Sequence, residues 1–318
     1  MNNNLIPIFF TIDDSYAPFL SVALSSAIKN RSENRLYKAI ILSESLNEEN
    51  KAKLSSLQTE NFKIEFVTVS QGLETITDRM SNRLRCDYFT LTIYFRLFIP
   101  AMFPMYDKGI YIDSDVVING DLAELFDTEL KSNYIAACRD LSVSDVPPLV
   151  EYMENAVGVP KDCYINSGVL LMNLKALREA ELDKHFLTLL NTYGFDCIAP
   201  DQDYLNAMCY GKILYLPEAF DAMPNNAKPP LKDAKIIHYN LFSKPWCYDD
   251  IQYSEYFWQY AESSDYADEI RRCKENYSNE KKAADSACLE LLLRRGHEIA
   301  NSDITFKKLF ENGVKIRL

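Results

Sequence analysis

Two aspartates separated by one residue form the strongest chemical feature of the sequence. Asp113 and Asp115 follow the apolar run 109–112, and residues i and i+2 of a strand point to the same face of a sheet. Two carboxylates at that spacing repel each other unless a cation lies between them. Hard oxygen ligands favour Mg²⁺ or Mn²⁺, so the pair predicts a divalent-metal site. A pair of loop or helix-capping aspartates is the alternative interpretation.

His238 lies near the end of another short apolar run, residues 235–239. An imidazole and two carboxylates are a suitable ligand set for Mn²⁺, with Mg²⁺ as the alternative. Ligands of an open α/β sheet bind at the carboxyl ends of its strands, so we expect these three groups on one rim. A histidine with a structural role is the competing interpretation.

No glycine-rich phosphate loop follows any predicted strand, and Asp13 and Asp14 follow the first strand instead. The net charge is −12, so an anionic substrate would need a bridging cation. A metal ion bound by acidic residues could bridge to a diphosphate. It would hold the phosphates without a glycine-rich loop and would offset the negative charge of the protein. Asp13 could equally cap a helix. Lys244 could bind phosphate or lie exposed in its loop.

Two further groups are candidates for the site. Arg96 lies in an apolar helical segment, so it needs a partner, which is either a core carboxylate or a substrate anion. Asp201 and Gln202 follow Pro200 and precede a predicted helix. They are site residues or helix caps.

The composition is that of a globular protein. The 318 residues are 47% apolar and 25% charged, which excludes a disordered, collagenous or disulfide-scaffold chain. No apolar run approaches the roughly 20 residues of a membrane span, and the start does not resemble a signal peptide. We therefore expect a cytoplasmic protein. The acidic balance disfavours nucleic-acid binding.

The hydrophobic pattern predicts an α/β fold. Apolar runs at 5–12 and 37–42, and a segment at 62–69 in which apolar and polar residues alternate, are separated by helical patterns around 20–28 and 45–58. This is the opening of an open, mostly parallel sheet. Ser45 and Glu48 match a capping box for the second helix. Further strands are expected at 109–112, 134–138, 167–172, 213–216 and 235–239, and helices at 91–99, 174–190, 204–210 and from Tyr253 to the end.

In order along the chain, six segments resemble glycosyltransferase family 8, a retaining family with the GT-A fold. The resemblance covers roughly residues 5–250. The segments are IFFTIDDSY (8–16), TIYFRL (92–97), YIDSDV (111–116), YINSGVLLMNL (164–174), DQDYLN (201–206), and IHY with KPW (237–239 and 244–246). This resemblance implies a Rossmann-like catalytic domain over 1–250 and a helical extension over 251–318.

The resemblance also implies roles for individual residues. Asp113, Asp115 and His238 would bind Mn²⁺, which bridges the diphosphate of a UDP-sugar. Thr11 and Asp13 would contact uridine, and Lys244 the β-phosphate. Asp14, Tyr16 and Ser114 belong to the implied nucleotide-binding segments. The donor sugar would be positioned by Arg96, Asn166, Asp201 and Gln202, with Gln202 beneath the anomeric carbon.

One position departs from the family pattern. Leu241 stands where the family usually has a glycine, three residues after the histidine. A side chain there would crowd the approach to the pyrophosphate, so we expect the loop to run differently. Gln202 is a poor nucleophile, so we favour attack from the leaving-group side, with the leaving phosphate taking the proton of the acceptor.

The leading hypothesis is a transferase that moves glucose or galactose from UDP-glucose or UDP-galactose to a glycan or lipid-linked acceptor at the cell surface. A nucleotidyltransferase would need a glycine- and arginine-rich loop after the first strand. A non-catalytic relic, a protein that has lost the transferase activity, would not need the complete set of three metal ligands. Self-glucosylation is a variant of the first hypothesis. We expect at most peripheral contact with the inner face of the membrane, and a homo-oligomer is compatible with the sequence.

Overall fold

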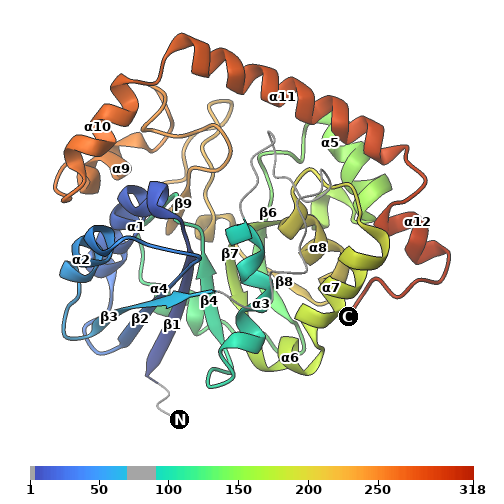
Figure 1. The fold of residues 1–318 in the computed structure, drawn as a ribbon, viewed down its shortest axis with the longest axis horizontal. Helices are drawn as coiled ribbons and strands as arrows, with labels where there is room; N and C mark the ends of the chain where they lie inside the picture. Colours follow the sequence, from blue (N-terminus) through green and yellow to red (C-terminus); the bar gives the residue numbers. More distant parts are fainter. Residues whose placement is uncertain (1–3, 70–90) are drawn as a thin grey trace.

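The computed structural model describes residues 4–69 and 91–318. A seven-stranded sheet forms its centre (Figure 1), in the order β3-β2-β1-β4-β7-β6-β8. The pairs β1–β2, β2–β3, β1–β4 and β6–β8 are parallel, whereas β7 is antiparallel to β4 and β6. The predicted open, mostly parallel sheet is thus confirmed. The strands are β1 (Leu5–Thr11), β2 (Leu36–Ser43), β3 (Phe62–Thr68), β4 (Gly109–Ile112), β6 (Ile135–Arg139), β7 (Ile165–Met172) and β8 (Ile213–Tyr215).

The central strands of the sheet are buried on both faces. Along β1 the fully buried side chains alternate, so that Phe9 joins one hydrophobic core while Ile8 and Phe10 join the other. Successive side chains of a strand point to opposite faces, and a sheet covered on both faces requires apolar residues at every position. The continuous apolar runs of the sequence have this cause.

A second, two-stranded sheet lies beside the first. β5 (Val116–Ile118) pairs antiparallel with β9 (Ile236–His238), and Val116 is opposite His238. The backbone N–H of Tyr239 donates to the carbonyl of Asp115 at 3.0 Å. This register brings a segment near residue 115 next to one near residue 238.

The helices differ from the predictions in several places. α2 (Glu48–Ser56) is capped by Asn47, which accepts from the backbone N–H of Asn50, so the predicted Ser45 cap is wrong. The predicted single helix 174–190 is two helices, α6 (Leu174–Glu179) and α7 (Leu182–Tyr193), because Glu181 adopts a left-handed backbone with φ 54°. α8 (Pro200–Cys209) begins before residue 204, since proline is well suited to a first helical turn.

The remaining helices cover the sheet and its ends. α1 (Ala17–Asn30) is in the core that contains Ile8, and α3 (Phe95–Met102) and α7 are in the core that contains Phe9. Shorter helices are α4 (Leu122–Phe126) and α5 (Pro147–Tyr152). Among the described residues, no helix is both long and apolar enough to cross a membrane.

Residues 251–318 form a chain of helices that reaches across the molecule. They are α9 (Ser254–Ala261), α10 (Ala267–Glu275), α11 (Asn279–Ala300) and α12 (Phe306–Glu311). In Figure 1 they run from the side of α1 over the top of the sheet to α5. Phe257 of α9 is buried against Trp246, with ring centroids 4.9 Å apart. The contact between Phe257 and Trp246 therefore lies inside the protein.

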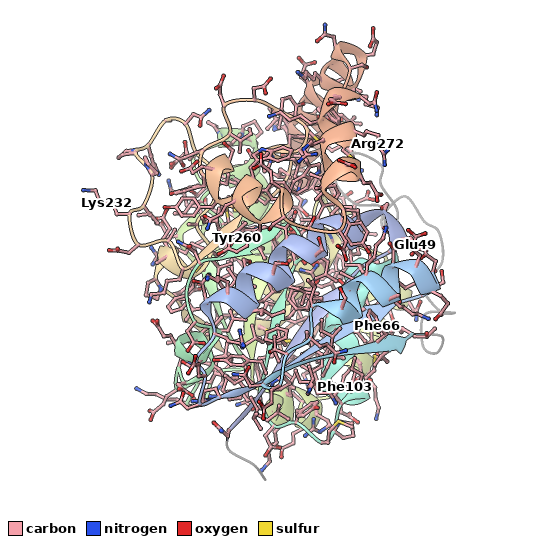
Figure 2. The ribbon with its side chains drawn as sticks, turned by 90° about the vertical axis from the view of Figure 1, so that its left-hand side faces the viewer. Glu49, Phe66, Phe103, Lys232, Tyr260 and Arg272 are labelled. Atoms are coloured by element: carbon pink, nitrogen blue, oxygen red, sulfur yellow. The ribbon has the colours of Figure 1, made fainter. Side chains whose placement is uncertain are left out.

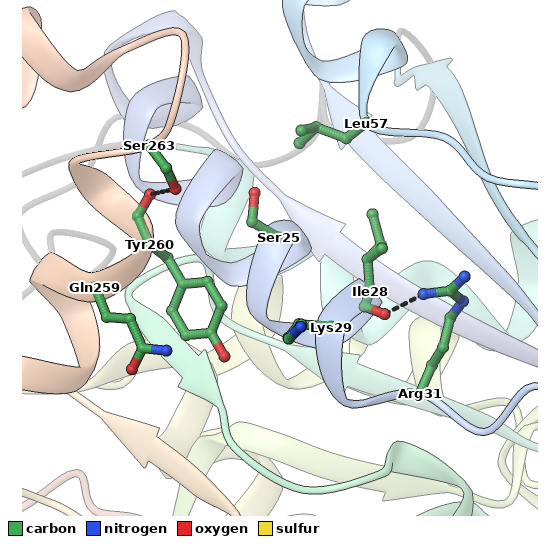
Figure 3. Close-up of a pocket in the computed structure, with 8 residues that line it drawn as sticks. All are labelled: Ser25, Ile28, Lys29, Arg31, Leu57, Gln259, Tyr260 and Ser263. Carbon is green, nitrogen blue, oxygen red and sulfur yellow. Dashed lines mark hydrogen bonds between the residues drawn. The ribbon is translucent and has the colours of Figure 1, made fainter.

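A cavity of about 530 Å³ lies where the extension meets α1 and the end of α2. Figure 2 shows Tyr260 of α9 on the same side of the molecule as Glu49 of α2. The cavity contains none of the residues proposed above for chemistry. It is lined by Ser25, Ile28, Lys29, Arg31, Leu57, Gln259, Tyr260 and Ser263 (Figure 3).

Candidate active site

Asp113, Asp115 and His238 converge at the ends of three strands. Asp113 follows β4, Asp115 precedes β5 and His238 ends β9. Nε2 of His238 lies 3.4 Å from Oδ1 of Asp115 and 3.9 Å from Oδ2 of Asp113. One ligand atom from each residue lies within 4.8 Å of the others. The predicted convergence on one rim is confirmed.

The local backbone structure of the two aspartates differs from the prediction, which placed both on one strand. β4 ends at Ile112 and β5 starts at Val116, so the pair lies in a bend between two strands and not within one strand. The antiparallel partner β9 holds the far side of the bend in place. The resulting oxygen and imidazole donors fit Mn²⁺ or Mg²⁺.

Gly168 provides the space in which these ligands meet. It lies on β7, and its carbonyl accepts from the backbone N–H of Asp113 at 2.7 Å. A Cβ on Gly168 would lie 2.3 Å from Cε1 of His238 and 2.9 Å from Oδ2 of Asp113. Real Cβ atoms essentially never approach other atoms this closely. The absence of a side chain at this position therefore fits a metal site.

One oxygen of Asp113 is held by two donors. Arg96 donates from Nη2 to Oδ1 at 2.8 Å, and the Tyr111 hydroxyl donates to the same oxygen at 2.7 Å. The guanidinium of Arg96 also lies over the Tyr111 ring, 4.3 Å from its centroid. Because these contacts use Oδ1, Oδ2 remains turned toward His238.

Arg96 joins the metal-ligand side to the helix α8. Nη1 of Arg96 lies 3.2 Å from Oδ2 of Asp201, and it donates to the carbonyl of Ser167 at 2.7 Å. Burial raises the pKa of Asp201, and the positive charge of Arg96 acts against that rise. The core ion pair considered for Arg96 is therefore present, with two carboxylates as partners.

Asn166 and Gln202 meet at a carboxylate that sequence reasoning missed. Gln202 donates from Nε2 to Oδ2 of Asp140 at 2.9 Å, and Asn166 donates from Nδ2 to the same oxygen at 3.3 Å. Oε1 of Gln202 accepts from the backbone N–H of Ser167 at 3.1 Å. Asp140 is buried just after β6. Its place after a strand was a signal that could have found it.

Lys244 lies beside Asp115 and forms an ion pair with Oδ2 of that residue. Burial raises the pKa of Asp115, but Lys244 and His238 together hold it well below its usual value. Burial alone would lower the pKa of Lys244, and the negative charge of Asp115 raises it. A buried ammonium thus reaches the metal-ligand group.

The residues after β1 are placed at the same edge of the sheet. The hydroxyls of Thr11 and Tyr111 are 2.9 Å apart, which connects Thr11 to Asp113 through Tyr111. Asp13 accepts from the backbone N–H groups of Ser15 and Tyr16, so the capping interpretation holds for its side chain.

The three other residues predicted to bind the nucleotide differ in their hydrogen bonds and in their exposure to solvent. Asp14 accepts from the backbone of Asn47 at 2.9 Å and from Nδ2 of Asn50 at 2.8 Å, which fastens it to α2. Tyr16 is 37% exposed. Ser114 is buried between the two aspartates.

Leu241 has a left-handed backbone. Its φ of 51° lies in the region that favours glycine and that leucine rarely adopts. A glycine would take this conformation without strain. The loop from His238 to Lys244 therefore has a glycine-type backbone although a leucine occupies the position.

Asp221 was not predicted as a site residue. Its Oδ1 lies 2.9 Å from Nδ1 of His238, and both side chains are buried. Burial alone would lower the pKa of His238, but Asp221 and Asp115 raise it to about 10. Asp221 follows a short turn (Glu218–Phe220), so no local pattern in the sequence indicated it.

Known glycosyltransferases are similar to this chain. The sequence model of glycosyl transferase family 8 matches residues 7–250. A putative glycosyltransferase of Haemophilus influenzae is 31% identical over 220 residues, which cover 69% of this chain and 64% of that protein. A lipopolysaccharide 1,2-glucosyltransferase of Escherichia coli K12 is 26% identical over 258 residues, covering 74% of this chain and 71% of that protein.

Solved structures share the architecture. The galactosyltransferase LgtC, in complex with donor and acceptor sugar analogues, has a TM-score of 0.69 and 26% identity, covering 82% of this chain and 96% of that one. The bifunctional glycosyltransferase WbbM has a TM-score of 0.73 at 24% identity. The match spans 86% of this chain and 52% of WbbM. A sequence identity of 24% supports a shared fold and no shared activity.

The fold is therefore the GT-A fold of nucleotide-sugar transferases. The chain belongs to glycosyltransferase family 8. The chain spans 64% of the length of the Haemophilus relative and about half of WbbM.

Proposed function

We propose that the chain is a retaining, Mn²⁺-dependent transferase that moves glucose or galactose from a UDP-sugar to a glycan or lipid-linked acceptor. The group of Asp113, Asp115 and His238 carries this proposal, because its ligand atoms lie within 4.8 Å of one another. A carboxylate and imidazole set of this kind favours Mn²⁺, with Mg²⁺ as the alternative. The names of two relatives, a glucosyltransferase and a galactosyltransferase, support a hexose donor.

The cationic groups of the site serve the diphosphate. A divalent cation at Asp113, Asp115 and His238 would neutralise the charge that develops on the departing UDP. Lys244 is the second cation at this edge, paired with Asp115, and we assign the β-phosphate to its ammonium.

The turn after β1 serves the nucleotide. Asp13 caps this turn and so fixes the backbone from Asp13 to Tyr16. We assign the uridine contacts to Thr11 and Asp13. Asp14 braces the turn against α2, Tyr16 offers an exposed ring, and Ser114 lies between the metal ligands, so these three are assigned to the remainder of the nucleotide site.

The amide and carboxylate groups behind the metal ligands serve the donor sugar. We assign this sugar to Arg96, Asn166, Asp201 and Gln202, with Gln202 beneath the anomeric carbon. The Gln202 amide is held at both ends, by Asp140 and by the backbone of Ser167, so its orientation is fixed. An amide is a weak nucleophile. We therefore propose attack by the acceptor from the side of the leaving group, with the leaving phosphate taking the acceptor proton.

The helical extension completes the proposal. Residues 1–250 form the catalytic domain, and 251–318 are a helical extension that shapes the binding of the acceptor or of a partner. In the extension, α9 and α10 contact α1, and α11 contacts α5. A location in the cytoplasm with at most peripheral membrane contact, and assembly into a homo-oligomer, stay predictions from the sequence.

Donor turnover in the absence of acceptor tests the proposed function. UDP release would be measured from UDP-glucose, UDP-galactose and UDP-N-acetylglucosamine, with Mn²⁺ and with EDTA. We expect slow release from one of the first two donors that stops with EDTA. Tight, Mn²⁺-dependent binding of UDP without turnover would indicate an untested donor or an obligate acceptor. Absence of UDP binding would favour the non-catalytic relic, and formation of UDP-sugar from UTP and a sugar phosphate would favour a nucleotidyltransferase.

A further inference from the structure

Asp221 is a buried carboxylate whose position is explained by His238. Oδ1 of Asp221 lies 2.9 Å from Nδ1 of His238, on the side of the ring opposite to Nε2. Nε2 is the nitrogen that faces Asp113 and Asp115. The imidazole therefore stands between a carboxylate that is outside the metal-ligand group and two carboxylates that are inside it.

The backbone holds Asp221 in register with His238. The N–H of Ala222 donates to the carbonyl of Ile236 at 2.8 Å, and the N–H of His238 donates to the carbonyl of Ala222 at 2.9 Å. These bonds involve no side-chain atom of Asp221. A substitution of Asp221 therefore leaves the backbone connection to β9 intact.

The surroundings of Asp221 give it no favourable role in packing. Its second oxygen, Oδ2, is buried and has no hydrogen-bond partner among residues 4–69 and 91–318. A buried polar atom without a partner lowers stability. The carboxylate is therefore better explained by its contact with His238 than by the stability of the core.

We infer that Asp221 is the positioning residue of the metal site, which fixes the tautomer and the ring orientation of His238. This inference rests on the proposed function, because it assumes that His238 binds a metal. A neutral imidazole carries its proton on one nitrogen only. When Nδ1–H donates to Asp221, the lone pair of Nε2 is directed at the space between Asp113 and Asp115. Carboxylates commonly orient metal-binding histidines in this way.

Two substitutions separate this role from a structural one. Asp221→Leu keeps the branched shape of the side chain and removes the acceptor, together with the unpartnered oxygen. Asp221→Asn keeps an acceptor oxygen for Nδ1–H. The control is Glu151→Gln, because Oε2 of Glu151 lies 2.7 Å from Nδ1 of His297, in a carboxylate–histidine pair outside the site.

The experiment measures Mn²⁺ binding to the full chain by electron paramagnetic resonance, with UDP present, together with the nitrogen coupling from a bound imidazole. Thermal unfolding in EDTA reports the fold. We expect Asp221→Leu to bind Mn²⁺ about 10–100-fold more weakly and to lose the imidazole coupling. Asp221→Asn should recover most of the affinity, and Glu151→Gln should bind as wild type does.

Three results would overturn this inference, and they can be told apart. If Asp221→Leu binds Mn²⁺ with wild-type affinity and coupling, Asp221 does not position His238, whereas the proposed function stands. The same holds if Asp221→Leu lowers only the unfolding temperature in EDTA. If wild type binds no Mn²⁺ in the presence of UDP, both the inference and the proposed function fail.

Discussion

Gly168 and His238 fit together so closely that no other residue can replace the glycine without moving the histidine. A Cβ on Gly168 would lie 2.3 Å from Cε1 and 2.9 Å from Nδ1 of His238. The imidazole in turn is fixed by Asp221 on its far side. β7 thus defines the position of the histidine although it contributes no ligand atom of its own.

Replacement of Gly168 by alanine tests this relationship. We expect Gly168→Ala to weaken Mn²⁺ binding by about 5–150-fold, because the new methyl group displaces the imidazole at a cost of about 1–3 kcal/mol. Gly296→Ala is the control, since the nearest atom to its Cβ is the flexible end of Leu149 at 3.2 Å. Equal Mn²⁺ affinities of the two variants, measured by calorimetry, would contradict the account.

Arg96 is expected to stabilise the fold through two carboxylates. In Arg96→Lys a single ammonium replaces a fork that contacts Asp113 and Asp201. We expect the free energy of unfolding to fall by about 2–3 kcal/mol, because a buried carboxylate loses its partner.

The control for Arg96 is Arg35→Lys. Arg35 makes a two-bond contact with Asp127, whose side chain is 58% exposed. An exposed pair of this kind contributes at most about 1 kcal/mol. Denaturant unfolding measures both variants, and similar losses in the two would show that Arg96 is not a buried structural cation.

Asp140 is expected to affect the sugar side of the site and not the nucleotide side. In Asp140→Asn the single amide oxygen must serve both Gln202 and Asn166 without a negative charge. The charged hydrogen bonds that are lost contribute about 1–3 kcal/mol, so we expect turnover to fall by about 5–150-fold. The affinity for UDP should stay unchanged. A fall in UDP affinity with normal turnover would assign Asp140 to the nucleotide instead.

Leu241 is expected to store backbone strain. At φ 51° a residue with a Cβ costs roughly 1–2 kcal/mol more than glycine. Leu241→Gly removes this strain, whereas Leu241→Ala keeps it and differs from the glycine variant by one methyl group. We therefore expect the glycine variant to be more stable than the alanine variant by about 1 kcal/mol in denaturant unfolding. The opposite order would show that the left-handed backbone at Leu241 is not strained.

The main strands and the metal-ligand group were predictable from the sequence. The central strands are buried on both faces, so they appear as continuous apolar runs, of which residues 5–12 are the clearest. The edge strand β3 is exposed on one face and alternates instead. The ligands Asp113, Asp115 and His238 follow or end such runs. Ligands gather at strand ends in open α/β sheets, so their convergence could be predicted, although what brings His238 to Asp115 is the antiparallel pairing of β5 with β9 in the second sheet.

Residues that act on these ligands were harder to find. Asp221 follows a short turn and reaches His238 only because the backbone of Ala222 is bonded to β9. Contacts between distant segments of this kind leave no local pattern. Asp140 follows a strand as Asp113 does, but it lacks a second acidic residue at close spacing.

Local backbone conformations were the other source of error. The break at Glu181 depends on a left-handed residue that the helical pattern of 174–190 does not reveal. At α2, Asn47 and Ser45 are both good capping residues. Asp14 bonds to the backbone of Asn47 and to the side chain of Asn50, and this tertiary contact favours the later start of the helix.

Calorimetric binding of UDP, with Mn²⁺ and then with EDTA, tests most directly whether Asp113, Asp115 and His238 form a metal site for a nucleotide diphosphate. The account predicts that wild type binds UDP with Mn²⁺ and loses this binding in EDTA. Asp113→Asn combined with Asp115→Asn should bind UDP weakly in both conditions. Its unfolding temperature, measured alongside, should fall, because Arg96 and Lys244 lose their charged partners. UDP binding that is equally tight in EDTA, or that survives the double substitution, would contradict the account.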